Sequence, residues 1–271
     1  MTQTLQLDGA TRVLAIVGDP IAQVKSPAGV SAALQQQGRN AILVPSHVSP
    51  ANLDAYVKGI SLAGNLDGII VTVPHKFAMF AQCSSTSDRA RRLGAVNVMR
   101  RNADGSWHGD MCDGAGYVAA MRAAGCQPEG KRALLVGAGG AGSAIALALL
   151  ENGVSELAIH DADTSRRDQL ITRLNASFPG QLAIGSHDPS GFAIAINASP
   201  TGMQASDPLP IDASKLHGDM FVGDVITAPA VTPLIESARA LGCQTVVGGD
   251  MFAAVRELML DFLLAQGPLA G

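Results

Sequence analysis

Residues 131–161 read KRALLVGAGGAGSAIALALLENGVSELAIHD, and this segment organises the rest of the chain. A short apolar run, Arg132 to Val136, ends in a glycine-rich turn and is followed by a long Ala, Leu and Ile segment. Gly137, Gly139 and Gly142 fit the spacing G-x-G-x-x-G. In that motif the first glycine allows the tight turn, the second lets a pyrophosphate approach the backbone, and the third brings helix and strand together. The pattern predicts a strand, a glycine turn and a helix.

A second apolar run, Glu156 to Ile159, follows at the distance expected of a βαβ unit and ends in His160 and Asp161. An acidic residue about 20 positions after the glycines holds the ribose 2′-hydroxyl in NAD-binding folds. The intervening helix would point its unpaired N–H groups and the positive end of its dipole at the phosphates. Glycine turns also occur where nothing binds, but this combination favours dinucleotide binding over a purely structural turn.

The composition describes a globular chain of 271 residues, 47% of them hydrophobic and 15% charged, which is long enough for two domains. The net charge of −4 provides no basic field to attract nucleic acid. We expect no metal site and no membrane span, because cysteines and histidines lack ligand spacing and no apolar run is long enough. The N-terminus lacks the apolar core of a signal peptide, which predicts a cytoplasmic protein with reduced thiols at Cys83, Cys112, Cys126 and Cys243.

The first part of the chain alternates strands and helices. A Ser-Pro pair predicts each of the first two helices, with Ser26 or Ser49 as N-cap and proline at the first helical position. Strands are expected at residues 12–17, 41–45 and 67–73, helical stretches up to residue 93, and a hairpin of residues 95–100 and 107–111. This alternation predicts a mainly parallel sheet.

The second part continues in the same alternation from Asp113 onward. The expected elements are helices at 113–125, 165–175, 232–241 and 250–266, with strands at 181–184, 192–197, 220–225 and 244–247 around the glycine-rich unit. We therefore expect an α/β protein of two α/β domains with a cleft between them. The substrate-binding domain is predicted at residues 1–113 together with a C-terminal helix at about 250–271. The Rossmann-type NAD(P)-binding domain is predicted at residues 114–249.

Two residues are candidates for acid–base chemistry, because hydride transfer requires a proton acceptor beside the reacting carbon. Lys76 follows a predicted strand and Pro74, and Asp113 lies at the expected hinge just before a helix N-terminus. An isolated lysine in a loop is more often a solvated surface charge. The residues alone therefore leave this assignment open.

Eight segments, in order and over nearly the whole chain, resemble the shikimate dehydrogenase family: GDPIAQVKSP (18–27), VTVPHK (71–76), GAVN (94–97), GDMCDG (109–114), GAGGAG (137–142), NASPTGM (197–203), TPLIESARALG (232–242) and GGDMF (248–252). Enzymes of this family reversibly reduce a 3-dehydro cyclohexene acid to shikimate, and some relatives act on quinate. The resemblance implies that Lys76 relays the proton of the reacting hydroxyl while Asp113 holds and polarises that hydroxyl. It also implies that Asn97 and Thr72 bind ring hydroxyls and that Ser26 binds the substrate carboxylate.

The chain departs from the family pattern at four positions that the resemblance places around the substrate. Val24 stands where a serine is expected, Ile70 replaces an asparagine, Thr227 a tyrosine and Val255 a glutamine. A substrate group left buried without a partner costs about 1–3 kcal/mol. We therefore expect altered or weak activity on shikimate, the alternative being that neighbouring residues or waters compensate.

The resemblance also bears on the cofactor. NADP-using members carry an Asn-Arg-Thr run after the second strand, whereas this chain has Asp161-Ala162-Asp163, and a carboxylate repels a 2′-phosphate. We therefore expect NAD rather than NADP, with Arg166 and Arg167 facing solvent. The cofactor site is expected to comprise Gly137, Ala138, Gly139, Gly140, Ala141, Gly142, Asp161, Asn197, Ser199 and Gly248.

These features predict an NAD-dependent dehydrogenase acting on shikimate, quinate or a related cyclic hydroxy acid, amino-substituted acids included. One alternative is an ordinary shikimate 5-dehydrogenase of aromatic amino acid biosynthesis. Another is a catalytically silent nucleotide-binding regulatory protein, although the retention of both Lys76 and Asp113 argues against silence. The expected partners are a small-molecule substrate, no nucleic acid and no membrane, and the chain is expected to be a monomer or a homodimer.

Overall fold

The computed structural model describes residues 7–269, which fall into two compact units. Residues up to Met111 and those from Arg256 onward form the first unit, and Cys112–Val255 forms the second. The sequence prediction places the boundary after residue 113 and gives the whole last helix to the first domain, whereas the structure divides that helix at Arg256. Residues 1–6 and 270–271 of the predicted first domain lie outside the described residues.

The sheet of the first unit has the strand order β2-β1-β3-β5-β6-β4. Its strands are β1 (Arg12–Gly18), β2 (Ala41–His47), β3 (Leu66–Val71), β4 (Ser85–Thr86), β5 (Val98–Arg101) and β6 (Trp107–Asp110). The first three strands are parallel, and β5 and β6 form the predicted antiparallel hairpin. Every residue of β3 is buried, as expected for a central strand that is covered on both faces.

The helices of the first unit begin differently from the prediction. They are α1 (Ser26–Gln36), the short 3-10 turn η1 (Pro50–Asn52), α2 (Leu53–Ile60), the 3-10 turn η2 (Ala78–Gln82) and α3 (Asp88–Leu93). Ser26 is not the N-cap of α1: Lys25 takes that position with a backbone that is already helical, and no side chain caps the helix. Ser49 does precede η1, but its side chain makes no capping bond either.

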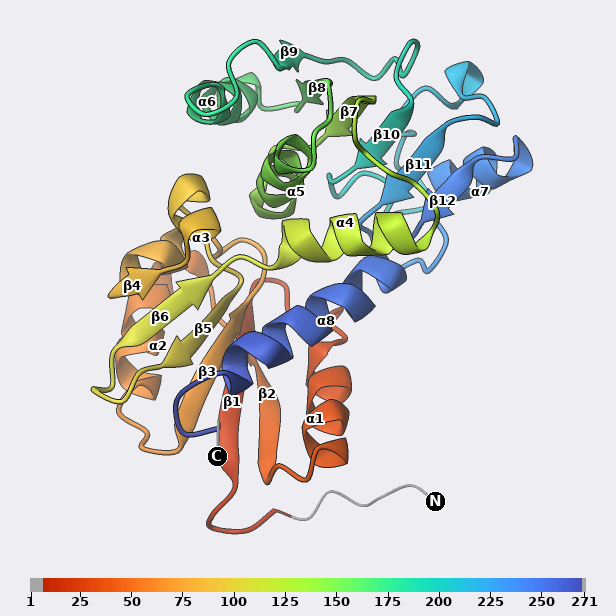
Figure 1. The fold of residues 1–271 in the computed structure, drawn as a ribbon. Coiled ribbons are helices and arrows are strands. Elements are labelled where there is room, and N and C mark those ends of the chain that lie inside the picture. The colour runs from red at the N-terminus through yellow and green to blue at the C-terminus, as the bar shows by residue number, and fades with distance from the viewer. Residues whose placement is uncertain (1–6, 270–271) are drawn as a thin grey trace. The chain divides into compact units, whose positions relative to one another are not determined.

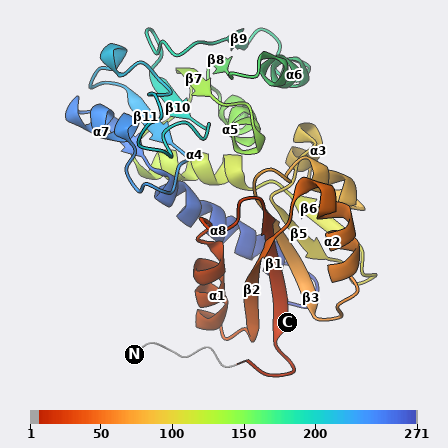
Figure 2. The same ribbon diagram turned by 180° about the vertical axis from the view of Figure 1, so that it is seen from behind.

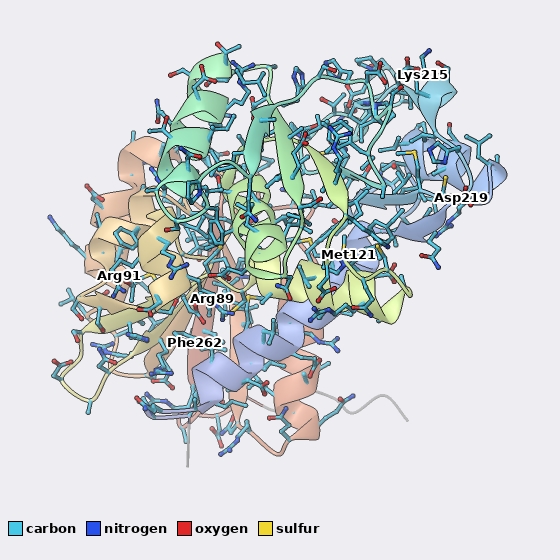
Figure 3. All side chains as sticks on the ribbon, turned by 45° about the horizontal axis from the view of Figure 1, so that its top comes forward. Arg89, Arg91, Met121, Lys215, Asp219 and Phe262 are labelled. Carbon is cyan, nitrogen blue, oxygen red and sulfur yellow. The ribbon has the colours of Figure 1, made fainter. Side chains whose placement is uncertain are left out.

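The last turns of helix α8 (Gly248–Leu264), from Arg256 onward, belong to the first unit. A methyl group on Gly68 of β3 would lie 2.5 Å from Leu263, so this glycine allows the helix to approach the sheet closely. The Arg100 guanidinium lies 4.7 Å from the centre of the Phe262 ring, which is labelled in Figure 3, and donates a hydrogen bond to the Phe262 carbonyl. Figures 1 and 2 show these turns of α8 and helix α2 on opposite faces of the sheet.

The sheet of the second unit is parallel throughout, in the order β12-β11-β10-β7-β8-β9. Counted from β7, this is the order 3-2-1-4-5-6 of dinucleotide-binding folds, in which the topological switch point lies between the first and fourth strands. The strands are β7 (Arg132–Val136), β8 (Glu156–His160), β9 (Leu182–Ile184), β10 (Ile194–Asn197), β11 (Phe221–Asp224) and β12 (Gln244–Val246). The switch point is therefore between β7 and β10.

The helices of the second unit are α4 (Asp113–Ala123), α5 (Gly140–Glu151), α6 (Thr164–Asn175), the 3-10 turn η3 (Ala213–Lys215) and α7 (Pro233–Ala240). Helices α4 and α5 pack closely because Gly114 has no side chain: a methyl group there would lie 2.1 Å from the Ala144 carbonyl oxygen. This packing holds the N-terminus of α4, where Asp113 lies. Within residues 7–269, no helix combines the length and the apolar character needed to cross a membrane.

Candidate active site

The glycine turn after β7 gives each of its three motif glycines a different environment. Gly137 has φ +110°, and a methyl group on it would lie 2.6 Å from the carbonyl carbon of Ala198. A methyl group on Gly142 would lie 1.9 Å from the Gly137 carbonyl oxygen, whereas one on Gly139 would meet nothing within 4 Å. The first and third glycines therefore allow close packing, and the second faces open space. This arrangement fits the approach of a pyrophosphate.

Helix α5 begins at this turn with Gly139 as its N-cap, and no side chain caps it. The Ser143 hydroxyl instead donates to the Ala138 carbonyl oxygen at 3.1 Å, inside the turn. A helix N-terminus whose N–H groups are not taken by a side chain attracts anions. Together with the open space at Gly139, it fits the phosphates of a dinucleotide.

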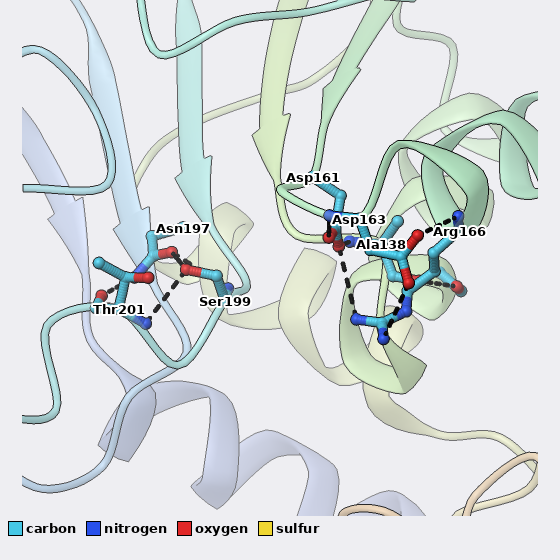
Figure 4. Close-up of polar contacts among 8 residues, drawn as sticks. Ala138, Asp161, Asp163, Arg166, Asn197, Ser199 and Thr201 are labelled. Carbon is cyan, nitrogen blue, oxygen red and sulfur yellow. Dashed lines mark hydrogen bonds and ion pairs between the residues drawn. The ribbon is translucent and has the colours of Figure 1, made fainter.

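Asp161 follows β8 and contacts the glycine turn directly. Its carboxylate accepts hydrogen bonds from the N–H of Ala138 at 2.6 Å and from the N–H of Asp163 at 2.8 Å. The Arg166 guanidinium lies 3.9 Å from the Asp161 carboxylate and 3.4 Å from that of Asp163, as Figure 4 shows. The position therefore carries an arginine as well as two carboxylates.

Arg166 and Arg167, in the first turn of α6, do not both face solvent as predicted. The Arg166 side chain is 52% exposed but reaches back to Asp161 and Asp163. The Arg167 side chain is only 14% exposed and pairs with Asp168. The prediction was wrong for Arg167, because helix α6 begins at Thr164 with Asp163 as its N-cap and so turns residue 167 inward.

A second loop at the switch point begins at Asn197, the last residue of β10. Its Oδ1 accepts hydrogen bonds from the Ser199 N–H at 3.0 Å and from the Ser199 hydroxyl at 2.6 Å. Its Nδ2 donates to the Thr201 carbonyl oxygen at 3.0 Å (Figure 4). Asn197 thus ties its own loop together, and the backbone of that loop meets Gly137 across the switch point.

In the first unit, backbone hydrogen bonds join the three segments that carry Thr72, Lys76 and Asn97. The Thr72 N–H donates to Val17, and the Val96 N–H donates to the Lys76 carbonyl at 2.9 Å. Asn97 is buried; its N–H donates to Asp110 and its carbonyl accepts from Val71. These bonds place the loop after β3 beside the loop before β5, with Lys76 partly buried.

His75 fixes the position of the loop after β3, because its buried ring nitrogen Nε2 lies 2.7 Å from the Val48 carbonyl oxygen. Gly18, at the end of β1, is required by this packing: a methyl group there would lie 2.4 Å from the Thr72 methyl. Ser26 is buried at the start of α1, and Val24 is partly buried just before it. The first unit thus places Thr72 and Lys76 after β3, beside Asn97 before β5, whereas Thr227 and Val255 belong to the second unit.

Two of the four positions that depart from the family pattern are packing residues. Ile70 is 3% exposed within β3, where it pairs with Ile16 of β1 and Val98 of β5. Val255 is 5% exposed, and a methyl group on Gly116 of α4 would lie 2.4 Å from it. Both aliphatic side chains fill tightly packed regions. Thr227 and Val24 are only partly buried.

Gly248, predicted to bind cofactor, is the first residue of α8 and lies against the backbone after β11. A methyl group on it would lie 2.3 Å from the Ile226 carbonyl oxygen. Asp113 is the first residue of α4 and is buried. Lys76 belongs to the first unit and Asp113 to the second, so their pairing remains a prediction.

The sequence analysis missed a buried cluster around Asp110, at the end of β6. Its carboxylate accepts hydrogen bonds from Ser87 and from Arg89, the latter bidentate at 2.7 and 2.5 Å (Arg89 is labelled in Figure 3). Burial alone would raise the pKa of Asp110, but the bonds from Arg89 and Ser87 outweigh it, and the pKa is lowered. Because the Asp110 carbonyl accepts the Asn97 N–H, this cluster supports the loop that carries Asn97.

It also missed Asp224, at the end of β11. This carboxylate is 1% exposed and accepts hydrogen bonds from Asn197, from the Ile226 N–H and from the Thr232 hydroxyl. Burial raises its pKa, more than the hydrogen bonds from Ile226, Thr232 and Asn197 lower it. The available signal was an acidic residue closing the apolar run MFVGD, at the same end of the sheet as Asp161.

Comparisons with known proteins agree with this architecture. The family model described as the shikimate dehydrogenase substrate binding domain matches residues 16–99. The chain is 36% identical over 249 residues to the shikimate dehydrogenase (NADP(+)) of Rubrobacter xylanophilus, covering 90% of this chain and 87% of that protein. It is 34% identical over 254 residues to the enzyme of the same name from Rhodospirillum rubrum, covering 90% and 89%.

Solved structures show the same fold. A shikimate dehydrogenase in complex with NADP+ matches with a TM-score of 0.91 at 26% identity, covering 99% of this chain and 95% of that one. Quinate dehydrogenase from Corynebacterium glutamicum in complex with NAD matches with 0.85 at 29% identity, covering 94% of each chain. The ligand-free 5-ketofructose reductase of a Gluconobacter strain matches with 0.83 at 28% identity, also covering 94% of each chain.

The prediction of NAD as the preferred cofactor was wrong. Relatives that are similar over most of the chain are named as NADP(+) enzymes, and NADP+ is bound in a matching structure. The local geometry is compatible with NADP+. The Asp161 carboxylate accepts hydrogen bonds from the N–H groups of Ala138 and Asp163, and the Arg166 guanidinium lies beside it. An arginine near the end of the second strand can accommodate a 2′-phosphate in folds of this kind.

Proposed function

This chain belongs to the shikimate dehydrogenase family and is an oxidoreductase that acts on a CH–OH group, and from this premise we propose that it is an NADP-dependent shikimate dehydrogenase. The observation that carries the proposal is the match to named shikimate dehydrogenases along 90% of the chain. The second unit also supports the proposal. Its glycine turn and the N-terminus of α5 offer partners for the pyrophosphate, and Arg166 offers a partner for the 2′-phosphate.

Lys76 is proposed to take the proton of the reacting hydroxyl during oxidation and to return it during reduction. When bound, the nicotinamide accepts the hydride in one direction and donates it in the other. Asp113 is proposed to hold and polarise the hydroxyl, and its burial at the start of α4 supports a fixed position for its carboxyl group. A positioned acid–base group of this kind contributes about 10²–10⁴ to the rate.

Thr72, Asn97 and Ser26 are proposed to bind the substrate. The backbone bonds that join their loops in the first unit support a fixed arrangement of Thr72 and Asn97 around Lys76. Hydroxyl and amide groups at these positions suit the ring hydroxyls, and the Ser26 hydroxyl suits the carboxylate. Gly137 to Gly142, Asp161, Asn197 and Ser199 are proposed to line the cofactor site.

The sequence analysis expected weak activity on shikimate, and the comparisons instead favour ordinary shikimate reduction. The structure gives a reason to prefer this reading, since Ile70 and Val255 are packed in the interiors of their units. A substituted residue that fills a core removes no partner from the substrate. Only Val24 and Thr227 are then left as departures in the proposed substrate pocket.

Quinate is the second candidate substrate. A quinate dehydrogenase is 29% identical and matches the fold over 94% of this chain. Val24, which stands where the family has its first carboxylate-binding serine, is the residue through which selectivity between the two acids would differ. Amino-substituted analogues belong to the same test.

A substrate panel tests the proposal. Reduced nucleotide formation is followed spectroscopically with shikimate, quinate and their amino analogues, each with NADP+ and with NAD+. Shikimate with NADP+ is expected to give the highest kcat/KM. If the folded protein binds NADP+ but turns over none of these acids, the proposal fails and the alternative of a silent nucleotide-binding protein takes its place.

A further inference from the structure

Asp224 is a buried carboxylate whose partners are all uncharged. The Ile226 N–H donates to it at 2.9 Å, the Thr232 hydroxyl at 2.8 Å, and Asn197 Nδ2 at 3.2 and 3.3 Å. Burying a carboxylate is costly unless donors surround it, and Asn197, Ile226 and Thr232 supply those donors here. The bond to Asn197 connects it with the loop at the switch point.

Asn197 has one orientation that satisfies both ends of its side-chain amide. Its Nδ2 gives one hydrogen to Asp224 and the other to the Thr201 carbonyl, while Oδ1 accepts from the N–H and the hydroxyl of Ser199. Both oxygens of Asp224 accept hydrogen bonds, one from the Ile226 N–H and the other from the Thr232 hydroxyl, and the Nδ2 end of the amide is the end that faces them. Asp224 thus selects which end of Asn197 faces the loop.

The loop held by Asn197 meets the glycine turn. The Ala198 N–H donates to the Val136 carbonyl at 2.7 Å, and a methyl group on Gly137 would lie 2.6 Å from the Ala198 carbonyl carbon and 2.7 Å from the Ser199 nitrogen. With so little space between the two backbones, a shift of the Asn197 loop moves the turn as well. The chain of contacts from Asp224 to the glycine turn is therefore continuous.

We infer that Asp224 is a positioning residue for the cofactor: by fixing the amide of Asn197, it sets the backbone of residues 197–201 against the glycine turn and so the affinity for NADP(H). This inference rests on the proposed function. An amide at position 224 would offer both a donor and an acceptor, so the Asn197 side chain could then turn over and release Ser199.

The test uses Asp224→Asn, which conserves shape. We expect its dissociation constant for NADP+, measured by calorimetry, to rise about tenfold, the equivalent of one lost charge-assisted hydrogen bond. Amide hydrogen exchange at Ser199 and Thr201, measured without nucleotide, should become faster. The KM for shikimate should rise less than the dissociation constant for NADP+, because Ser26, Thr72 and Asn97 belong to the first unit. The exchanged pair Asp224→Asn with Asn197→Asp restores one donor facing one acceptor but loses the bond to the Thr201 carbonyl, and should recover part of the affinity.

A second variant covers the case in which Asp224→Asn does not fold. Asn197→Asp places two carboxylates face to face, and such pairs share a proton at acid pH. Its affinity for NADP+ should therefore improve as the pH falls, unlike that of the wild type. Val222→Ala, in the core of the same strand, is the control and should lower Tm without changing the affinity.

The outcomes separate the inference from the proposed function. Unchanged NADP+ affinity and unchanged exchange in folded Asp224→Asn would overturn the inference and leave the proposed function intact. Failure of the exchanged pair to recover affinity would also overturn it, as would a pH-independent Asn197→Asp. A wild-type protein that binds no NADP+ would overturn both.

Discussion

Two charged residues, Lys76 and Asp113, carry the proposed proton transfer. Replacing Lys76 by Ala should lower kcat by about two to four powers of ten, the range for losing acid–base help, while NADPH binding stays nearly intact. Asp113→Asn should be similarly severe. The double variant should cost much less than the sum of the single effects, because the two groups serve one step. Steady-state kinetics and nucleotide titration measure these effects.

Lys58→Ala is the control for this series, because Lys58 is an exposed lysine in the last turn of α2. It should leave kcat unchanged. Turnover of Lys76→Ala near that of the wild type would remove Lys76 and Asp113 from the mechanism. That result would leave the assignment of the cofactor site unchanged.

Arg166 carries the positive charge proposed to meet the 2′-phosphate. Its removal leaves the carboxylates of Asp161 and Asp163, which repel a phosphate and suit a 2′-hydroxyl. Arg166→Ala should therefore raise the KM for NADP+ about tenfold or more, and change the KM for NAD+ much less. Arg173→Ala, in the last turn of the same helix, is the control. Equal effects of Arg166→Ala on the two cofactors would contradict the assignment.

The Asp110 cluster predicts a pH-dependent contribution to stability. The pKa of Asp110 is lowered in the fold, so its bonds with Arg89 and Ser87 stabilise the protein above the pKa of the unfolded state, and this stabilisation is lost as the pH falls through the lowered value. Asp110→Asn should lower the free energy of unfolding by about 1–3 kcal/mol at neutral pH, with a smaller difference below about pH 4.

Urea unfolding at several pH values measures this difference. Asp88→Asn is the matched control, because Asp88 is an exposed carboxylate on α3 paired with exposed Arg91. It should change stability little at any pH, as is usual for surface ion pairs. A difference between wild type and Asp110→Asn that stays constant down to acid pH would show that packing, and not charge, accounts for the loss.

At the scale of elements, the glycine turn before α5 makes a sharp pair of predictions. A methyl group on Gly139 meets nothing in the protein, so Gly139→Ala should keep the wild-type Tm while weakening NADP+ binding about tenfold or more, because the methyl group takes the space of the pyrophosphate. Gly142→Ala should lower both the Tm and the affinity for NADP+, since its methyl group would lie 1.9 Å from the Gly137 carbonyl oxygen. Thermal denaturation and calorimetry measure the two properties.

The two variants would contradict the account if their effects were exchanged. A destabilised Gly139→Ala with normal binding would mean that the open space at Gly139 is not where the dinucleotide lies. The helix dipole and the uncapped N-terminus of α5 would then have to serve another ligand.

Element types were predictable where the apolar periodicity was long, as in the βαβ unit from Arg132 to His160. The first residues of the helices were harder to predict. Ser26 has the residue type of an N-cap, but the backbone is already helical at Lys25, and local preference cannot foresee that. The two-residue strand β4 was missed because its pairing with β6 depends on a partner more than 20 residues away.

At the scale of the whole molecule, residues on motifs were easier to find than residues that support them. The glycine turn, Lys76 and Asn97 stand out in the sequence, whereas Asp110 and Asp224 do not, because their roles depend on partners brought together by the fold. The cofactor prediction failed for the same reason. Arg166 was expected to face solvent, but in the folded unit its guanidinium lies beside the Asp161 carboxylate, which is bonded to the glycine turn.

The departures from the family pattern show how a position can mislead when its environment is unknown. Val255 in place of a glutamine looks like a lost hydrogen bond, yet its side chain packs against Gly116 of α4. Ile70 fills the interior of the first sheet. A substitution changes substrate binding only if the side chain reaches the substrate, and sequence alone does not establish that.

The central claim is that this chain oxidises shikimate with NADP+. The most direct test is kcat/KM for shikimate with NADP+, compared under the same conditions with NAD+ and with quinate. We predict the highest value for shikimate with NADP+, at about 10⁴ M⁻¹s⁻¹ or above, as is usual for an enzyme with its own substrate. A higher value with NAD+, or a preference for quinate over shikimate, would contradict the claim.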